Sequence, residues 1–207
     1  MSNKLKRRPV TPLSRKMPYL PELQRVSSAL RRLFTAASGN FGSDCFAHVA
    51  IAHELLARLG IQTTRICGYA AWRVNIHDPD IMLHAPLPGI PLQPGGFPYH
   101  MWLEIDDHLL DYTTYQLKQK VDRLNELDGG TTHCIWCPDF LFASMKSIST
   151  LRDVIQLRTG MYYYQRVPEL EAEIVAASSP LDEGDVATAW MLYQNQEMQV
   201  FGPRNMP

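Results

Sequence analysis

The sequence lacks an excess of charge of either sign, because 20 basic and 21 acidic residues leave a formal net charge of −1. This balance gives no reason to expect binding to nucleic acid or to an anionic membrane surface. No apolar run is long enough to span a bilayer, and no apolar signal-peptide segment follows the basic N-terminus. We therefore expect a cytoplasmic protein without nucleic-acid or membrane partners.

Cysteine is sparse, with Cys45, Cys67, Cys134 and Cys137 as the four thiols in 207 residues. In a reducing compartment each is explained by packing, metal binding or reactivity rather than by a disulfide. Internal repeats and low-complexity tracts are also missing. The composition, 45% hydrophobic and 20% charged, is ordinary for a globular protein, and the length suits one domain with a sizeable core.

The expected organisation is a basic, flexible tail at residues 1–16 followed by a single domain at 17–207. Helical spacing of apolar residues predicts helices over 21–37 and, most clearly, over 45–60. Residues 63–74 alternate as a strand whose Ile66, Ala70, Trp72 and Val74 share one face.

The rest of the chain contains fewer regular patterns. Residues 75–98 hold six prolines and three glycines, which predicts a long loop. Helices are expected near 140–158 and 183–194, within C-terminal helical additions that span 139–207. The core motifs lie between 40 and 114.

The helix predicted over 45–60 begins at Cys45, directly after a turn rich in glycine and serine. The unpaired N–H groups and positive dipole of a helix N-terminus favour a thiolate, which is the nucleophilic form of cysteine. A small buried residue that merely begins a helix is the better interpretation of an isolated cysteine. A partner for Cys45 would reverse that preference.

The stretch "HMWLEIDDHLLDYTT", residues 100–114, supplies such partners if it forms a hairpin. With a turn at Asp106 and Asp107, Trp102 faces Asp111, and His100 lies diagonal to Asp111. With a turn at Ile105 and Asp106, His100 lies directly opposite Asp111. Any even-length turn puts His100 and Asp111 on one face. The carboxylate can then orient the imidazole toward a nucleophile, as in a catalytic triad.

Four segments in this order resemble the transglutaminase-like branch of the papain-like superfamily. "SDCFAHVAIAHELLARLGI" is similar to its cysteine helix, "TTRICGY" to the following strand, "YHMWLEI" to its histidine strand and "LLDYTT" to its aspartate strand. The resemblance implies that Cys45 is the nucleophile, His100 the base and acid, and Asp111 the orienting group. It also implies an α+β fold in which the cysteine helix packs on an antiparallel sheet, with extra helices at both ends.

The other site residues are less specific. The backbone N–H of Cys45 and the side-chain amide of Asn40 are oxyanion donors to consider, although Asn40 fits a turn equally well. Tyr99 and Trp102 flank His100 and either line an acyl pocket or fill a strand core. His48, one helical turn beyond Cys45, is expected to pack rather than to touch the thiolate.

A second group, "HCIWCP" at residues 133–138, contains a Cys-x-x-Cys pair beside a histidine. Such a pair binds zinc, cycles as a dithiol or simply packs, and a structural zinc site needs four ligands. Only Cys67 and scattered histidines remain to complete one, so packing is the preferred interpretation. His77 and His84 lie in the proline-rich loop without an evident partner.

The expected activity is that of a thiol-dependent hydrolase or acyl transferase. It would act on a peptide, protein or small amide substrate, or on an ester, through a thioester intermediate. This chemistry requires no metal or organic cofactor. The alternative is a binding module on the same fold without turnover, and the oligomeric state is left open.

Overall fold

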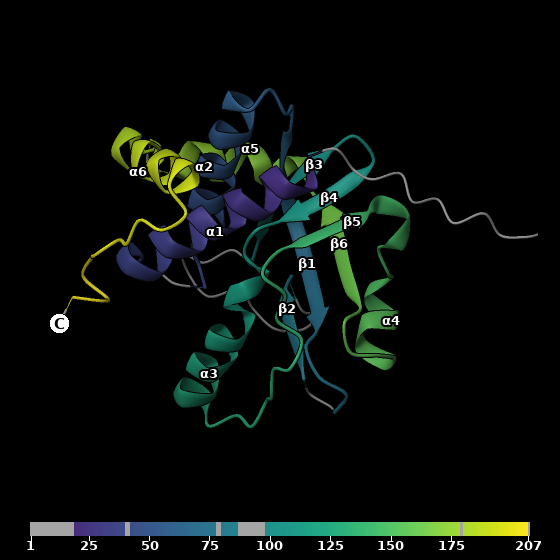
Figure 1. The fold of residues 1–207 in the computed structure, drawn as a ribbon. Helices are drawn as coiled ribbons and strands as arrows, with labels where there is room; N and C mark the ends of the chain where they lie inside the picture. The colour runs from purple at the N-terminus through teal and green to yellow at the C-terminus, as the bar shows by residue number, and fades with distance from the viewer. Residues whose placement is uncertain (1–18, 40–41, 78–79, 87–97, 179, 207) are drawn as a thin grey trace, which may run out of the picture.

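The computed structural model describes residues 19–39, 42–77, 80–86, 98–178 and 180–206. Over these residues the protein is an α+β fold, in which helices at both ends of the chain enclose a six-stranded sheet (Figure 1). The helices are α1 Leu20–Ala37, α2 Cys45–Arg58, α3 Leu117–Asp128, α4 Leu151–Gln156, α5 Pro168–Ala177 and α6 Glu183–Gln194. The strands are β1 Thr64–Arg73, β2 Ile81–His84, β3 His100–Ile105, β4 His108–Asp111, β5 Leu141–Ser144 and β6 Tyr162–Arg166. Two short 3-10 helices are η1 Thr114–Gln116 and η2 Met145–Ser147.

All strand pairs are antiparallel, and the sheet order is β2-β1-β3-β4-β5, with β6 also paired to β1. β1 is the long central strand, and Gly68 in it pairs with His100 of β3 and with Arg166 of β6. A Cβ added at Gly68 would overlap the backbone carbonyl oxygen of Gln165. Glycine therefore permits the close approach of β6 to the strand that also positions His100.

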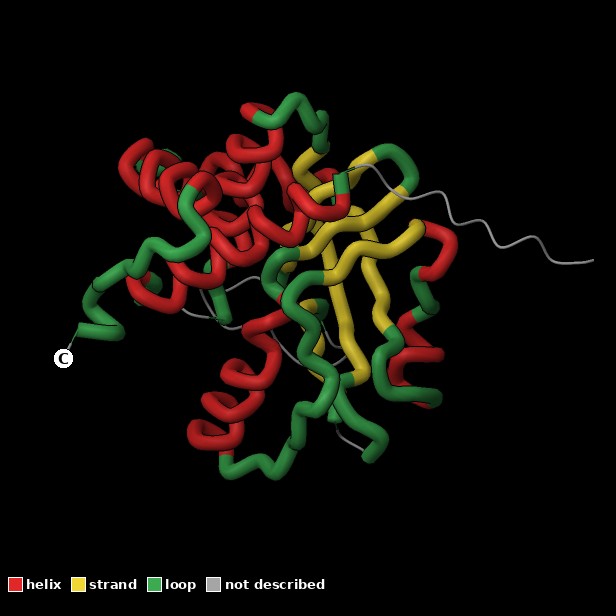
Figure 2. Tube along the Cα trace, in the orientation of Figure 1, coloured by secondary structure: helices red, strands yellow, loops and turns green. Residues whose placement is uncertain are grey.

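Most of the helices gather on one side of the sheet, as the red segments in Figure 2 show. α1, α2 and α6 contact one another, and α2 also packs on β3. Their apolar residues form one core with the inward residues of β3, whereas β1, β4, β6 and α3 contribute to a second core. Burial of these two apolar surfaces is the main stabilising contribution to the fold.

The predicted helices over 21–37 and 45–60 are confirmed, and so is the predicted face of β1. Asp44 occupies the N-cap position of α2, but its side chain bonds Ser38 instead of a backbone N–H of the helix. Gly60 follows the helix with a φ of 74°. The predicted residues Ile66, Ala70, Trp72 and Val74 of the β1 segment all lie in the second core.

The expected helix over 140–158 and the expected loop over 75–98 are both wrong in part. Only Leu151–Gln156 is α-helical within 140–158, because Leu141–Ser144 pairs with β4 and extends the sheet. The expected helical additions therefore contain the strands β5 and β6. The expected loop over 75–98 contains β2, which pairs with the second half of β1.

Two further helices, α3 and α5, were not predicted from the sequence. α3 follows the 3-10 turn η1, and α5 begins with Pro168 at its first position, where a proline N–H is not needed. Within the described part of the chain, no helix combines the length and apolar character needed to cross a membrane. The expected tail at residues 1–16 lies outside the described residues.

Candidate functional site

The hairpin of β3 and β4 has the even turn that the sequence predicts. Its register leaves Asp106 and Asp107 as a two-residue turn, with a φ of 52° at Asp106. His100 and Asp111 consequently point to the same face, and Nε2 of His100 lies 2.8 Å from Oδ2 of Asp111. The predicted histidine–aspartate pair is therefore present.

Asp111 is fully buried and accepts hydrogen bonds on both carboxylate oxygens. Oδ1 accepts from the backbone N–H and the hydroxyl of Thr113, at 2.8 and 2.7 Å. Oδ2 accepts from the Tyr164 hydroxyl at 2.7 Å as well as bonding His100. Burial alone would raise the pKa of Asp111, but the His100 charge and these donors hold it below its usual value.

Tyr164 was not predicted as a site residue. It comes from β6 and accepts a hydrogen bond from the Trp72 indole at 2.8 Å. The Trp72 ring also meets the His100 ring edge to face, with centroids 4.9 Å apart. The Asp111 carboxylate and the Trp72 ring thus hold the imidazole of His100, and Tyr164 holds the carboxylate.

The second nitrogen of His100 is available for a different partner. Nδ1 is buried and makes no hydrogen bond of ordinary geometry to any described residue. Burial by itself would lower the pKa of His100, but the charge and hydrogen bond of Asp111, followed by those of Cys45, raise it to about 9. The ring is consequently protonated near neutral pH, and Cys45 is close enough to interact with it.

Cys45 is the first residue of α2 and is 8% exposed. It lines a cavity of about 20 Å³ together with His100, Trp72 and Gln116. A larger neighbouring cavity, of about 330 Å³, is also lined by Cys45 and by Tyr99. The structure therefore brings Cys45 and His100 together at the small cavity, with Asp111 bonded to His100, and Cys45 also borders a ligand-sized space.

The other proposed pocket residues lie differently. Tyr99 lines the larger cavity, as expected for a pocket residue. Trp102 is 1% exposed and lies in the second core, which is the strand-core role that the sequence also allowed for it. Asn40 lies outside the described residues.

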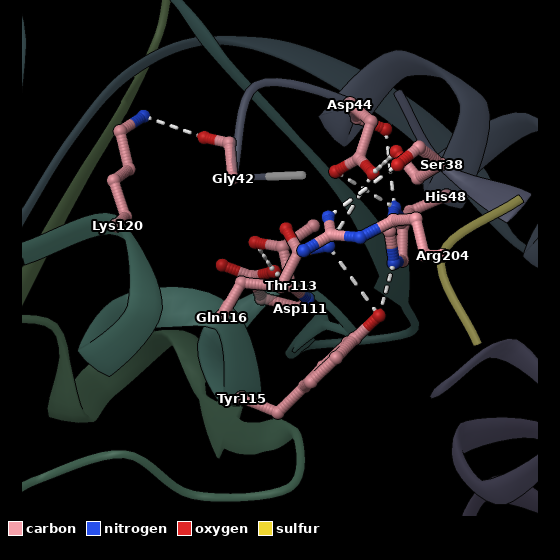
Figure 3. Close-up of polar contacts among 10 residues, drawn as sticks. All are labelled: Ser38, Gly42, Asp44, His48, Asp111, Thr113, Tyr115, Gln116, Lys120 and Arg204. Atoms are coloured by element: carbon pink, nitrogen blue, oxygen red, sulfur yellow. Dashed lines mark hydrogen bonds and ion pairs between the residues drawn. The ribbon is translucent and has the colours of Figure 1, made fainter. Parts of the chain in front are cut away.

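A second buried histidine, His48, lies near the N-terminus of α2 beside Asp44 (Figure 3). His48 Nδ1 lies 3.1 Å from the Asp44 backbone oxygen and 3.3 Å from its carboxylate, while Nε2 lies 2.9 Å from the Tyr115 hydroxyl. Its ring stacks on Phe34 at a centroid distance of 3.5 Å. This packing role is the one that the sequence favoured for His48.

Gln116 links this network to the cavity. Its side-chain amide donates to Asp44 Oδ2 and to the Tyr115 hydroxyl, both at 3.4 Å, and the residue also lines the small cavity beside Cys45. Both N–H groups of the amide are engaged, but at long distances, so a stronger acceptor in the cavity can replace one of the two partners. Nothing in its local sequence indicated this position, because η1 brings it to the cavity by tertiary packing.

Lys120 and His84 form a further polar contact at the cavity. Lys120 Nζ donates to the Gly42 carbonyl at 2.7 Å, which Figure 3 shows, and to His84 Nε2 at 2.5 Å. The sequence offered no partner for His84, so this pair is new information. Burial, Lys120 and His100 hold the pKa of His84 well below its usual value, which keeps the ring neutral.

The Cys134 and Cys137 side chains pack against the second core. Cys137 Sγ lies 3.1 Å from the Tyr115 carbonyl and 3.4 Å from that of Thr114, and Cys134 Sγ lies 3.4 Å from the Trp136 carbonyl. Hydrogen bonding to Cys134 lowers the pKa of Cys137 and raises that of Cys134. Among the described residues, no cluster of three or more His, Cys, Asp or Glu side chains could hold a metal ion.

Comparisons with known proteins identify a fold relationship without a function. No protein-family model matches the chain, and no curated protein matches it. A solved structure called "The crystal structure of genomics APC5867" is similar, with a TM-score of 0.59 and 14% identity over 90% of this chain and 82% of the other. At this level of identity the similarity shows a shared fold alone.

Proposed function

We propose that the protein is a thiol-dependent hydrolase or acyl transferase of the transglutaminase-like, papain-like type, acting on amide, peptide or ester bonds. The observation that carries the proposal is the state of the buried His100 ring. Its Nε2 bonds Asp111, its Nδ1 has no hydrogen-bond partner among the described residues, and Cys45 contributes to its raised pKa. This is the relationship of a nucleophile, a base and an orienting carboxylate.

The first half of the reaction begins with a proton held on His100, because its pKa of about 9 favours the imidazolium next to a thiolate. Cys45 Sγ attacks the substrate carbonyl carbon, a C–S bond forms, and the carbonyl electron pair moves to oxygen. When the intermediate collapses, the bond to the leaving amine or alcohol breaks. His100 Nδ1 supplies the proton that this leaving group needs, and a thioester remains on Cys45.

In the second half the neutral His100 removes a proton from water or an acceptor amine. The incoming oxygen or nitrogen bonds the thioester carbon, the C–S bond breaks, and Cys45 leaves as a thiolate. Asp111 keeps the proton of Nε2 directed at itself throughout, so Nδ1 always faces the reacting atoms. Tyr164 and Thr113 hold the carboxylate in that orientation.

Two donors are suited to the oxyanion. The backbone N–H of Cys45 belongs to the first turn of α2, where N–H groups have no carbonyl within the helix. The Gln116 amide lines the same cavity, and its two hydrogen bonds are long enough for an oxyanion to replace one of the acceptors. Both would act only once negative charge develops on the carbonyl oxygen, which is how such donors lower a barrier.

Competitive alkylation tests the proposal without a known substrate. Limiting iodoacetamide near neutral pH, followed by peptide mapping, should label Cys45 about tenfold or more faster than Cys134, whose pKa is raised. Cys67 is an internal negative control, because burial and the neighbouring Cys45 raise its pKa to about 12. An electrophilic peptide probe and substrate proteomics would then identify the substrate, and Cys45→Ala should abolish the covalent intermediate.

Equal labelling of Cys45 and Cys134 would contradict the proposal. So would a Cys45 rate that stays the same in His100→Ala, since the thiolate would then owe nothing to the imidazole. Either result would leave a binding module on this fold as the better description.

A further inference from the structure

Lys120 is the lysine of the site, and it lines both of the described cavities that contain Cys45. It lies in the first turn of α3, on the wall opposite the α2 N-terminus. The small cavity places it together with Cys45 and His100, and the larger one with Cys45 and Tyr99. Any ligand whose carbonyl reaches Cys45 must therefore pass close to this ammonium group.

The position of the ammonium group is fixed by two acceptors. Nζ donates to the Gly42 carbonyl and to Nε2 of His84. His84 is neutral and also hydrogen-bonds the backbone of Tyr99, so its Nε2 has a lone pair for Lys120. A protonated lysine has three N–H donors, and two acceptors leave one for a ligand.

Among the described residues, no carboxylate lines the larger cavity beside Lys120. Several of the lining residues are apolar: Met82, Leu83, Pro98, Tyr99 and Leu124. No ion pair between described residues includes Lys120. The nearby Asp44 carboxylate bonds Ser38, His48 and Gln116 instead.

An unpaired charge in such a space is unfavourable. Burial lowers the pKa of Lys120 to about 8, although Cys45 and Asp44 act in the opposite direction. A ligand anion would supply the missing partner, and a charge-assisted hydrogen bond in a poorly hydrated cavity is stronger than one in water. An apolar wall around one cation suits an anion carried on a short carbon chain.

We propose that Lys120 determines specificity by binding a carboxylate of the substrate, so that the preferred substrates are amides or esters bearing a carboxylate near the reacting carbonyl. The inference rests on the proposed thiol chemistry at Cys45. Lys120 acts on the substrate, whereas His100 and Asp111 act on the reacting atoms. A lysine that only stabilised the Cys45 thiolate would raise its rate with every electrophile alike.

The experiment compares two alkylating reagents of nearly equal size, the anion iodoacetate and the neutral iodoacetamide. The ratio of their rates at Cys45 is measured by peptide mapping in the wild type, Lys120→Gln, Lys120→Arg and Lys118→Gln. Lys118 is the matched control, since it is an exposed lysine on the same helix and lines neither cavity. We expect Lys120→Gln to lower the iodoacetate/iodoacetamide ratio about tenfold, and Lys120→Arg and Lys118→Gln to keep it.

An unchanged ratio in Lys120→Gln would overturn the inference, and so would an equal slowing of both reagents. Neither result affects the proposed function, which fails separately if Cys45 of the wild type is no more reactive than Cys134.

If Lys120→Gln loses its cooperative unfolding transition, a competition experiment on the folded Lys120→Arg and wild-type proteins decides. Glutarate should protect Cys45 from iodoacetamide in both, whereas its neutral diamide, glutaramide, should not. Equal protection by the two compounds, or none by glutarate, would overturn the inference.

Discussion

Two buried histidine–aspartate pairs flank Cys45, and they differ in how many imidazole nitrogens are engaged. In the pair of His48 and Asp44 both ring nitrogens have partners, and the ring stacks on Phe34. In the pair of His100 and Asp111 only Nε2 has one among the described residues, while Nδ1 is buried. Burial beside a carboxylate is therefore common to both, and the nitrogen without a partner distinguishes the histidine that we propose to react from the one that packs.

Each pair also has a tyrosine as its third member. Tyr115 bonds Nε2 of His48, so both ring nitrogens of that histidine have partners. Tyr164 bonds the aspartate of the other pair and leaves the histidine free to act. The two networks therefore use the same three residue types, but they connect them in different orders.

Replacing the histidines should have the largest and most unequal effect. We expect His100→Ala to lower the alkylation rate of Cys45 about 100-fold or more, because the base and the charge partner of the thiolate are both lost. His48→Ala should retain most of the reactivity but lower the free energy of unfolding by about 2 to 3 kcal/mol, since it removes buried packing and hydrogen bonds. Alkylation kinetics and chemical denaturation of both variants measure this difference. Equal Cys45 alkylation rates in His100→Ala and His48→Ala would show that the two histidines do not differ in role.

Replacing the aspartates should produce a smaller difference in Cys45 reactivity between the two pairs. Asp111→Asn keeps the shape but cannot stabilise the imidazolium and can hold the ring in the wrong tautomer. We expect Cys45 alkylation, or turnover once a substrate is known, to fall about 10- to 100-fold. Asp44→Asn should leave the rate within a few-fold of the wild type. A larger loss in Asp44→Asn than in Asp111→Asn would reverse the assignment of the two pairs.

The raised pKa of His100 predicts how stability depends on pH. Its pKa is about 9 in the folded protein, against an ordinary value of 6.5. A raised folded pKa contributes stability that is fully present below pH 6.5 and is lost as the pH rises through 9. The difference in free energy of unfolding between wild type and His100→Gln should therefore shrink over this window, as measured by denaturation at several pH values. A constant difference would mean that the pair does not hold an extra proton.

The smallest expected effect comes from the tyrosines. Tyr164→Phe leaves Asp111 with His100 and Thr113 but removes one donor and the acceptor of the Trp72 indole. We expect a loss of stability of about 1 to 3 kcal/mol and a few-fold lower Cys45 reactivity. Tyr115→Phe is the matched control on the other pair and should change stability alone. Identical kinetic effects of the two variants would show that Tyr164 has no special part in positioning Asp111.

The local parts of this arrangement could be predicted from the sequence. Side chains alternate between the two faces of a strand, so the length of the hairpin turn decides whether His100 and Asp111 share a face. The turn at Asp106 and Asp107 has two residues, and an even length puts both side chains on one face. The start of α2 at Cys45 follows from a turn before it and a helical period after it. Both are short-range rules, so they hold before the tertiary fold is known.

The remaining parts depend on contacts that no local rule specifies. Tyr164 lies 53 positions from Asp111, and Lys120 lies 36 positions from His84. The aromatic run at 162–164 favours a strand, but nothing in it indicates which strand it joins or which tyrosine faces the carboxylate. The expectation of a helix over 140–158 was wrong for the same reason, since pairing with β4 decides the state of residues 141–144.

The place of β6 in the chain has a consequence for biosynthesis. Synthesis proceeds from the N-terminus, so Cys45, His100 and Asp111 leave the ribosome before Tyr164 does. Until β6 docks beside Gly68, the Asp111 carboxylate has one donor fewer and β1 has an unpaired edge. We expect the nascent chain to carry Cys45, His100 and Asp111 without their final geometry. The order of synthesis would thus keep the proposed thiol chemistry latent until the domain is nearly complete.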